Sequence, residues 1–134
     1  MKADPVTESA VMGILNMYAI AYGKKDIENV ISLFAPDPDM VTIGVGQDDR
    51  RIGLTEFKDR LEAEVTRFEK AKMDFTWHSV SCSGNVAWIA ADIIMHEYYG
   101  SKEVNYPVRL TAVMEHRKER WLITQLHKSL PATG

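Results

Sequence analysis

The sequence lacks the features that would place it in an oxidising compartment or beside a charged polymer. Cys82 is the single cysteine among 134 residues, so no internal disulfide can form. The formal net charge of −3 provides no basic surface for nucleic acid or for an anionic membrane. We therefore expect a cytoplasmic protein that has no nucleic-acid partner.

Long apolar runs are also missing. The longest, such as residues 86–91, are far shorter than the roughly 20 residues of a membrane-spanning helix. Met1–Pro5 does not begin an apolar secretory signal, so we expect neither a membrane segment nor export by that route. The composition, 46% hydrophobic and 26% charged, is typical of a globular chain, and the length suits one domain over residues 1–134.

Motifs for cofactors, metals and nucleophiles are absent from the sequence. Gly44-x-Gly46 is followed by Gln-Asp-Asp-Arg, which does not continue a nucleotide-binding loop. Cys82 and the serines lie in no recognisable nucleophile motif. Spacing typical of metal ligands is also missing around the four histidines, so we expect no metal and no cofactor; they are His78, His96, His116 and His127.

The first third of the chain predicts a pair of helices. Asp4–Pro5 is a typical helix start, because aspartate caps the first turn and proline fits it. Apolar and aromatic residues then recur at helical spacing from Val11 to Tyr22, and Gly23 can end this helix in a left-handed conformation. Asp26 can cap a second, shorter helix, which Pro36 would end.

A short strand at Met40–Ile43, an exposed loop at 44–53 and a third helix are expected next. Thr55 is the expected cap of that helix, and Lys58 can pair with Glu62 across one turn of its wet side. The residues expected on its apolar face are Phe57, Leu61, Val65 and Phe68.

Strand-like patterns dominate the rest of the chain. They span 73–82, 86–99, 104–114 and 121–130, and their connections are too short for helical crossovers. The chain therefore predicts an α+β fold in which three N-terminal helices cover one face of an antiparallel meander.

Two segments carry a resemblance to a known family. They are YAIAYGKKDIENVISLFAPD (residues 18–37) and RWLITQLHKSLP (residues 120–131). With this order of elements, the chain resembles the nuclear transport factor 2-like superfamily and, more narrowly, the SnoaL-like proteins, over almost its whole length. The resemblance implies a cystatin-like half-cone, in which a strongly curved sheet wraps the helices and encloses a pocket, and a homodimer formed through the outer sheet face.

Functions in this superfamily vary from ketosteroid isomerase and polyketide cyclase to the association domain of calcium/calmodulin-dependent protein kinase II, so the fold does not settle the function. The isomerases use a tyrosine, a carboxylate base and a protonated aspartic acid. Tyr18 matches the tyrosine, although a core tyrosine is the more common explanation. The base position falls on Ile43 and Gly44, and the acid position on Thr111, so steroid-type isomerisation is disfavoured.

Alternation along 86–97 separates two sets of side chains. One set contains Trp88, Asp92 and His96, and a polar-tipped pocket needs such residues. At about 3.3 Å per residue, Asp92 and His96 are too far apart for a direct hydrogen bond. Either can instead face solvent or a dimer interface, and Asp92 is the best alternative base. The opposite set is entirely apolar and consists of Ala87, Ile89, Ala91, Ile93 and Met95.

Two interpretations conflict along 104–114. Alternation puts the apolar even-numbered positions in the core and leaves Arg109 in solvent, whereas the resemblance puts Thr111, and with it Arg109, in the cavity. We favour the cavity, where Arg109 would bind a carboxylate or phosphate. A final hairpin turning at Arg117–Lys118 puts His127 on the face opposite Thr111, unless one β-bulge reverses this. His127 is thus an interface residue or a pocket donor.

These residues predict a small cytoplasmic homodimer whose cavity binds a small organic molecule, anionic or carbonyl-bearing. A cofactor-independent isomerase or cyclase, with Asp92 or a histidine moving protons and Tyr18 as hydrogen-bond donor, is an alternative. An oligomerisation module resembling the kinase association domain is another. Trp77 and Trp88 would form walls of the cavity, although tryptophans are more often core residues. The expected ligand-binding residues are Tyr18, Tyr22, Trp77, Trp88, Asp92, His96, Arg109, Thr111 and His127.

Overall fold

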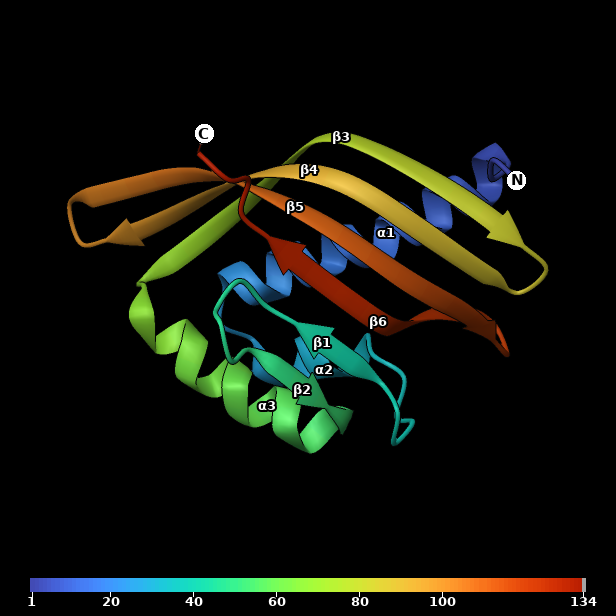
Figure 1. The fold of residues 1–134 in the computed structure, drawn as a ribbon, viewed down its shortest axis with the longest axis horizontal. Coiled ribbons are helices and arrows are strands. Elements are labelled where there is room, and N and C mark those ends of the chain that lie inside the picture. Colours follow the sequence, from blue (N-terminus) through green and yellow to red (C-terminus); the bar gives the residue numbers. More distant parts are fainter. Residues whose placement is uncertain (134) are drawn as a thin grey trace.

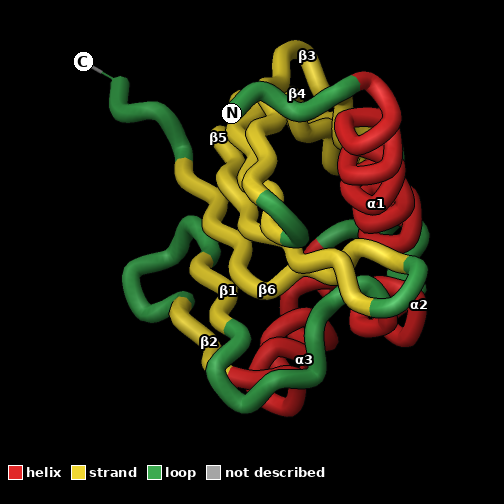
Figure 2. Tube along the Cα trace, turned by 90° about the vertical axis from the view of Figure 1, so that its right-hand side faces the viewer, coloured by secondary structure: helices red, strands yellow, loops and turns green. Residues whose placement is uncertain are grey.

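The computed structural model describes residues 1–133. It contains one curved six-stranded sheet with the order β2-β1-β6-β5-β4-β3, and its helices lie on one side of that sheet (Figures 1 and 2). Neighbouring strands are antiparallel, except that β1 runs parallel to β6. The predicted α+β architecture is therefore confirmed. The elements are α1 (Pro5–Gly23), α2 (Ile27–Ser32), β1 (Val41–Ile43), β2 (Arg50–Ile52), α3 (Gly53–Glu64), the 3₁₀ turn η1 (Val65–Arg67), β3 (Lys70–Ser83), β4 (Val86–Tyr99), β5 (Lys102–Arg117) and β6 (Arg120–Ser129).

Helix α1 begins as the sequence predicts. The Asp4 carboxylate accepts a hydrogen bond from the backbone N–H of Thr7 at 2.7 Å. The predicted left-handed end at Gly23 is wrong, because Lys25 takes the left-handed conformation with φ of 60°. Gly23 is needed for a different reason. A Cβ atom there would lie 2.1 Å from the backbone oxygen of Ala71, so only glycine allows α1 to pack this closely against β3.

Helix α3 differs from the sequence prediction at its start. It begins at Gly53 rather than after a Thr55 cap, and the Glu56 carboxylate accepts a hydrogen bond from the backbone N–H of Ile52 at 3.0 Å. Lys58 forms its ion pair with Glu28 of α2, at 2.9 Å, instead of with Glu62. The predicted apolar face is confirmed, since Phe57, Leu61, Val65 and Phe68 are all buried.

The segment between β1 and α3 is less exposed than expected. It contains strand β2, which pairs with β1. The side chain of Asp49 is buried and accepts a hydrogen bond from Arg60 of α3 at 3.1 Å. The loop is therefore anchored to the helix that follows it.

Two β-bulges interrupt the meander, and each has a threonine as the extra residue. Thr76 lies between the pairs Phe75↔Ile93 and Trp77↔Asp92, and Thr124 lies between Met114↔Ile123 and Val113↔Gln125. The Thr76 hydroxyl donates to the Asp92 carbonyl at 3.3 Å, and the Thr124 hydroxyl donates to the Val113 carbonyl at 3.1 Å. Because one extra residue reverses the alternation, each bulge decides which later side chains face the helices.

The core lies between the concave face of the sheet and the helices. The apolar set predicted on β4, Ala87 to Met95 at alternate positions, is buried there. So is the even-numbered set on β5, which includes Val108, Leu110, Ala112 and Met114. The predicted separation of apolar and polar faces is confirmed on both strands, and the apolar faces are the ones that meet the helices.

Candidate functional site

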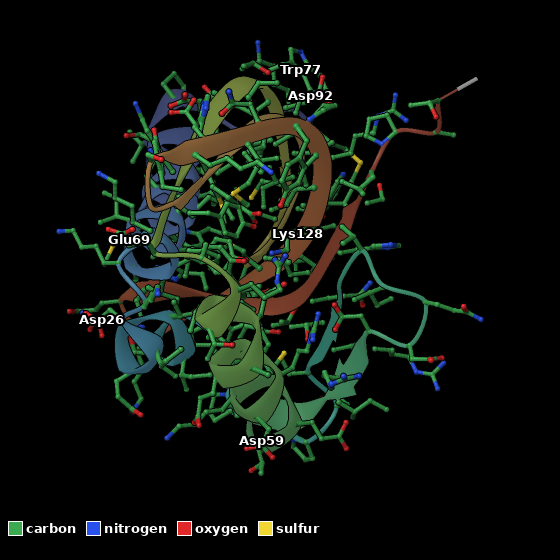
Figure 3. The ribbon with its side chains drawn as sticks, turned by 90° about the vertical axis from the view of Figure 1, so that its left-hand side faces the viewer. Asp26, Asp59, Glu69, Trp77, Asp92 and Lys128 are labelled. Carbon is green, nitrogen blue, oxygen red and sulfur yellow. The ribbon has the colours of Figure 1, made fainter. Side chains whose placement is uncertain are left out.

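Most of the residues expected in a cavity lie on the outer, convex face of the sheet. Asp92 and Arg109 face each other across β4 and β5 in solvent, and the side chains of Trp77 and Trp88 remain 52% and 36% exposed. Figure 3 shows Trp77 and Asp92 on the outside of the sheet, with Lys128 on the inside. Their placement in an interior cavity is therefore wrong, because simple alternation holds along β4 and β5. The exposed residues are Trp77, Trp88, Asp92, Arg109, Thr111 and His127.

His127 reaches the same outer face as Thr111. The final hairpin pairs Arg117 with Arg120, one residue later than expected, and the Thr124 bulge then sets Thr111 opposite His127. The turn lies at Lys118–Glu119 rather than at Arg117–Lys118, and the expected alternative in which one β-bulge reverses the face of His127 is confirmed. The bulge is the reason, since it shifts every residue after Thr124 by one position.

His96 also lies on the outer face, where it is half-buried. Its Nε2 atom is 2.8 Å from a carboxylate oxygen of Asp74, and its Nδ1 atom is 2.5 Å from the side-chain oxygen of Asn105. Glu103 approaches the same ring at 3.9 Å. His96 therefore links β3, β4 and β5 on the outside of the sheet and does not meet Tyr18 or Tyr22.

Tyr18 and Tyr22 are the predicted residues that do lie inside. Both are buried on α1, and their rings meet at a centroid distance of 6.0 Å. Lys128 of β6 reaches them from the sheet. Its ammonium donates a hydrogen bond to the Tyr18 hydroxyl at 2.9 Å and lies 4.9 Å from the centre of the Tyr22 ring. We call Tyr18, Tyr22 and Lys128 the lysine cluster.

Electrostatics keep Lys128 charged and Tyr22 neutral at neutral pH. Burial disfavours the ammonium of Lys128, yet its pKa is raised, because the tyrosine oxygens, the charge of Glu64 and the hydrogen bond to Tyr18 favour the charged form. Burial raises the pKa of Tyr22 well above the usual tyrosine value. The cluster thus presents the positive charge of Lys128 beside the neutral phenol of Tyr22.

A second polar cluster occupies the same concave face. The buried carboxylate of Glu97 accepts hydrogen bonds from the hydroxyls of Tyr99 and Tyr106, at 2.6 and 2.7 Å. Arg67 from η1 approaches it at 3.5 Å. Burial and the bond to Glu97 raise the pKa of Tyr106. We call Arg67, Glu97, Tyr99 and Tyr106 the glutamate cluster.

Sequence reasoning missed Glu97 and Lys128, although one of them left a signal. Glu97 is the next member of the alternating β4 set that ends at Met95, so extending that set by one step would have found it. Lys128 pairs with the buried Leu110 only because of the Thr124 bulge. Nothing in the local sequence marks a bulge, so Lys128 had no comparable signal.

The structure offers no metal site: among residues 1–133, no three histidine, cysteine or acidic side chains come together as metal ligands would. The helices of the same residues include none that is long and apolar enough to cross a membrane.

Comparisons with known proteins identify the family. The model of the SnoaL-like domain matches residues 11–133. A search of the curated proteins finds no match.

Solved structures show the same fold at low sequence identity. A protein of the nuclear transport factor 2-like family from Streptomyces avermitilis, provisionally assigned as a dehydratase, has a TM-score of 0.86 and 18% identity, with 97% of this chain and 100% of that chain covered. A Xanthomonas campestris protein, provisionally assigned as a calcium/calmodulin-dependent protein kinase II association domain, has a TM-score of 0.82 and 22% identity, with 99% and 96% covered. Because the family model spans nearly all of the chain and the fold agrees, this protein belongs to the SnoaL-like family.

Proposed function

We propose that the protein binds a small organic molecule with a carboxylate or carbonyl group, on the concave side of the sheet at the lysine cluster. The supporting observation is the Lys128 ammonium. It has three N–H donors, but within residues 1–133 its one hydrogen-bond partner is Tyr18, and no carboxylate lies within 4.0 Å. A half-buried cation without an ion-pair partner is costly, so an oxygen-bearing ligand is its natural partner.

Tyr18 strengthens this proposal. Its hydroxyl accepts the hydrogen bond from Lys128, which leaves the hydroxyl proton free to be donated to a ligand oxygen. The two groups would then contact the same carboxylate or carbonyl. In the sequence-based hypothesis Arg109 supplied the positive charge, and Lys128 takes over that role here because Arg109 lies on the outer face.

Native mass spectrometry of gently purified protein, followed by denaturing extraction, tests this function. We expect a retained organic acid or carbonyl compound in the wild type, and its loss from Lys128→Met. The matched control is Lys102→Met, an exposed lysine on β5 that should retain the compound. If Lys128→Met retains the same compound at the same occupancy, the proposed site is wrong. Tyr18→Phe provides a second variant if Lys128→Met folds poorly.

A cofactor-independent enzyme of the isomerase or cyclase type is the second candidate. Asp92 is not a suitable base, since it lies on the opposite side of the sheet from Tyr18. Glu97 supports this candidate better, because it is a buried carboxylate on the same concave face as Tyr18 and Lys128. Those two donors would stabilise an enolate oxygen while Glu97 accepts a proton. Glu97→Gln should then abolish turnover of the extracted compound while retaining its binding, and full turnover in that variant would exclude Glu97 as the base.

We also propose that two copies pair through the outer sheet face in the cytoplasm. The two exposed tryptophans, Trp77 and Trp88, support this, because large exposed aromatic side chains are enriched at protein interfaces. Sedimentation velocity should give a dimer for the wild type and a monomer for Trp88→Lys. A monomeric wild type would refute the pairing. A large ring would favour an assembly module instead, as the assignment of the Xanthomonas campestris protein suggests.

A further inference from the structure

A separate groove lies at the final hairpin of the sheet. It has a volume of about 1270 Å³ and is bounded by α2, the start of α3 and the β5–β6 turn. None of the residues of the lysine or glutamate clusters lines it. We call it the hairpin groove. Its apolar surface is formed by Ile31, Phe34, Leu54 and Leu122, and its basic rim by Lys118 and Arg120.

The walls of the hairpin groove are fixed by hydrogen bonds. The segment after α2 is tied to β6, because the backbone N–H of Ala35 donates to the Ile123 carbonyl at 2.8 Å and that of Ile123 donates to the Leu33 carbonyl at 2.9 Å. Arg117 ties the hairpin to the same segment through a hydrogen bond to Asp37 at 2.8 Å. The groove is therefore preformed, which reduces the entropy that a ligand would lose on binding.

The charges around the hairpin groove are unequally compensated. Arg117 is neutralised by Asp37 and Glu115, and its hydrogen bonds hold the pKa of the Asp37 carboxyl below its usual value. Arg120 donates to the backbone carbonyl of Ser32 but has no acidic partner within 4.0 Å in the described chain.

Lys118 is the other uncompensated cation. It occupies the turn with φ of 56° and has neither a hydrogen bond nor an ion pair from its side chain to any residue of 1–133. Glu119 is the acidic residue beside it on the lining. Two exposed cations thus lie over an apolar surface, and the complementary ligand has one negative group attached to an apolar body.

We propose that the hairpin groove is a second binding site, for an amphipathic organic anion. The acid group lies between Lys118 and Arg120, and an aromatic or medium-length alkyl body covers Ile31, Leu54 and Leu122. The volume exceeds the roughly 300–1,000 Å³ of common small-molecule sites, so a fused bicyclic ring fits. This site does not depend on the function proposed for the lysine cluster.

Nuclear magnetic resonance titration of the full chain with sodium 2-naphthoate tests the proposal. We expect saturable backbone shifts concentrated at residues 31–36, 54 and 117–122. The neutral analogue 2-naphthamide should bind about tenfold more weakly, because it loses the charge attraction to both rim cations at this solvent-exposed site. Equal affinity for both compounds, or no saturable shift up to the solubility limit, would overturn the proposal.

Variants locate the acid group. Lys118→Gln with Arg120→Gln should weaken 2-naphthoate binding by about tenfold, because both rim cations are lost. Lys118→Gln alone preserves the hydrogen bond from Arg120 to Ser32 and should weaken 2-naphthoate binding by about threefold. The control is Lys102→Gln with Arg109→Gln, which removes two exposed cations elsewhere and should leave the affinity unchanged.

The same titration separates this proposal from that for the lysine cluster. Lys128→Met should bind 2-naphthoate in the hairpin groove as the wild type does. Shifts that concentrate around Tyr18 and Lys128, and that disappear in Lys128→Met, would place the anion in the interior and overturn the second site. Loss of the hairpin-groove shifts in the rim variants would support the second site and would not affect the proposal for the lysine cluster.

Discussion

The two faces of the sheet carry similar residue types in opposite situations. The convex face presents Asp92, Arg109 and His127 to solvent, and the concave face carries the buried Glu97 and the half-buried Lys128. On the convex face water solvates each charge, so such residues cost little and indicate little about function. On the concave face Glu97 is compensated by Tyr99, Tyr106 and Arg67, whereas Lys128 is hydrogen-bonded only to Tyr18 within residues 1–133. The comparison shows that burial, rather than residue type, identifies the groups that constrain this fold.

The largest expected effect comes from adding one carbon atom where α1 packs on the sheet. Gly23→Ala should destabilise the protein by about 3 kcal/mol, because its Cβ would lie 2.1 Å from a backbone oxygen of β3 and backbone must move. Gly13→Ala on the same helix is the control. No heavy atom lies within 4 Å of a Cβ there, so it should stabilise by about 0.5–1 kcal/mol through helix propensity. Urea unfolding measures both, and equal changes would contradict the close packing.

The next effect compares two acidic residues on opposite faces of β4. Glu97→Ala should lower the free energy of unfolding by about 2 kcal/mol, because Tyr99 and Tyr106 lose the charged acceptor of their part-buried hydrogen bonds. Asp92→Ala should change it by less than about 0.5 kcal/mol, as for most surface substitutions. Chemical denaturation of the two variants measures both changes in the free energy of unfolding. Similar losses would remove the energetic distinction between the faces.

Alkaline pH should expose the burial of Tyr22. Its pKa is raised in the folded protein, so above about pH 10 the unfolded chain loses this proton while the folded chain keeps it. The contribution of Tyr22 to the free energy of unfolding is fully present below pH 10 and declines as the pH rises further. Between pH 10 and 11 the wild type should therefore lose about 1 kcal/mol more than Tyr22→Phe. Urea titrations at the two pH values measure this, and parallel declines would show that Tyr22 ionises freely when folded.

The smallest expected effect tests the exposed arginine. Arg109→Ala should change stability by less than about 0.5 kcal/mol and leave binding of the extracted compound unchanged. Thermal unfolding and native mass spectrometry check the two parts. Loss of the compound from this variant alone would return the binding site to the convex face.

Much of the fold follows from local patterns in the sequence. Asp4 caps α1, and strict alternation along β4 and β5 separates the buried set from the exposed set. The cavity placement of Arg109 and Thr111 was wrong, because it followed the family resemblance, whereas alternation along β5 placed both residues on the outer face. The alternation of side chains along a regular strand predicts the face of a residue more reliably than an ungapped comparison with a distant relative does.

The remaining features depend on contacts that no local pattern shows. Gly23 is required by Ala71 on a distant strand, and Lys128 faces inward because of a bulge at Thr124. The start of α3 is set by Glu56 in the first turn rather than by Thr55, which resembles a cap. Each is a tertiary effect, so the interior clusters could not be assembled from the sequence alone.

The Thr124 bulge also indicates how such a site could change during evolution. If the strand closed into regular pairing at this residue, the segment after it would turn over, with His127 inside and Lys128 outside. A group that titrates near neutral pH would then replace a permanent cation next to Tyr18, although neither residue had been substituted. The bulge held by the Thr124 hydroxyl thus decides whether Lys128 or His127 faces Tyr18. A single substitution at Thr124 could therefore exchange one group for the other.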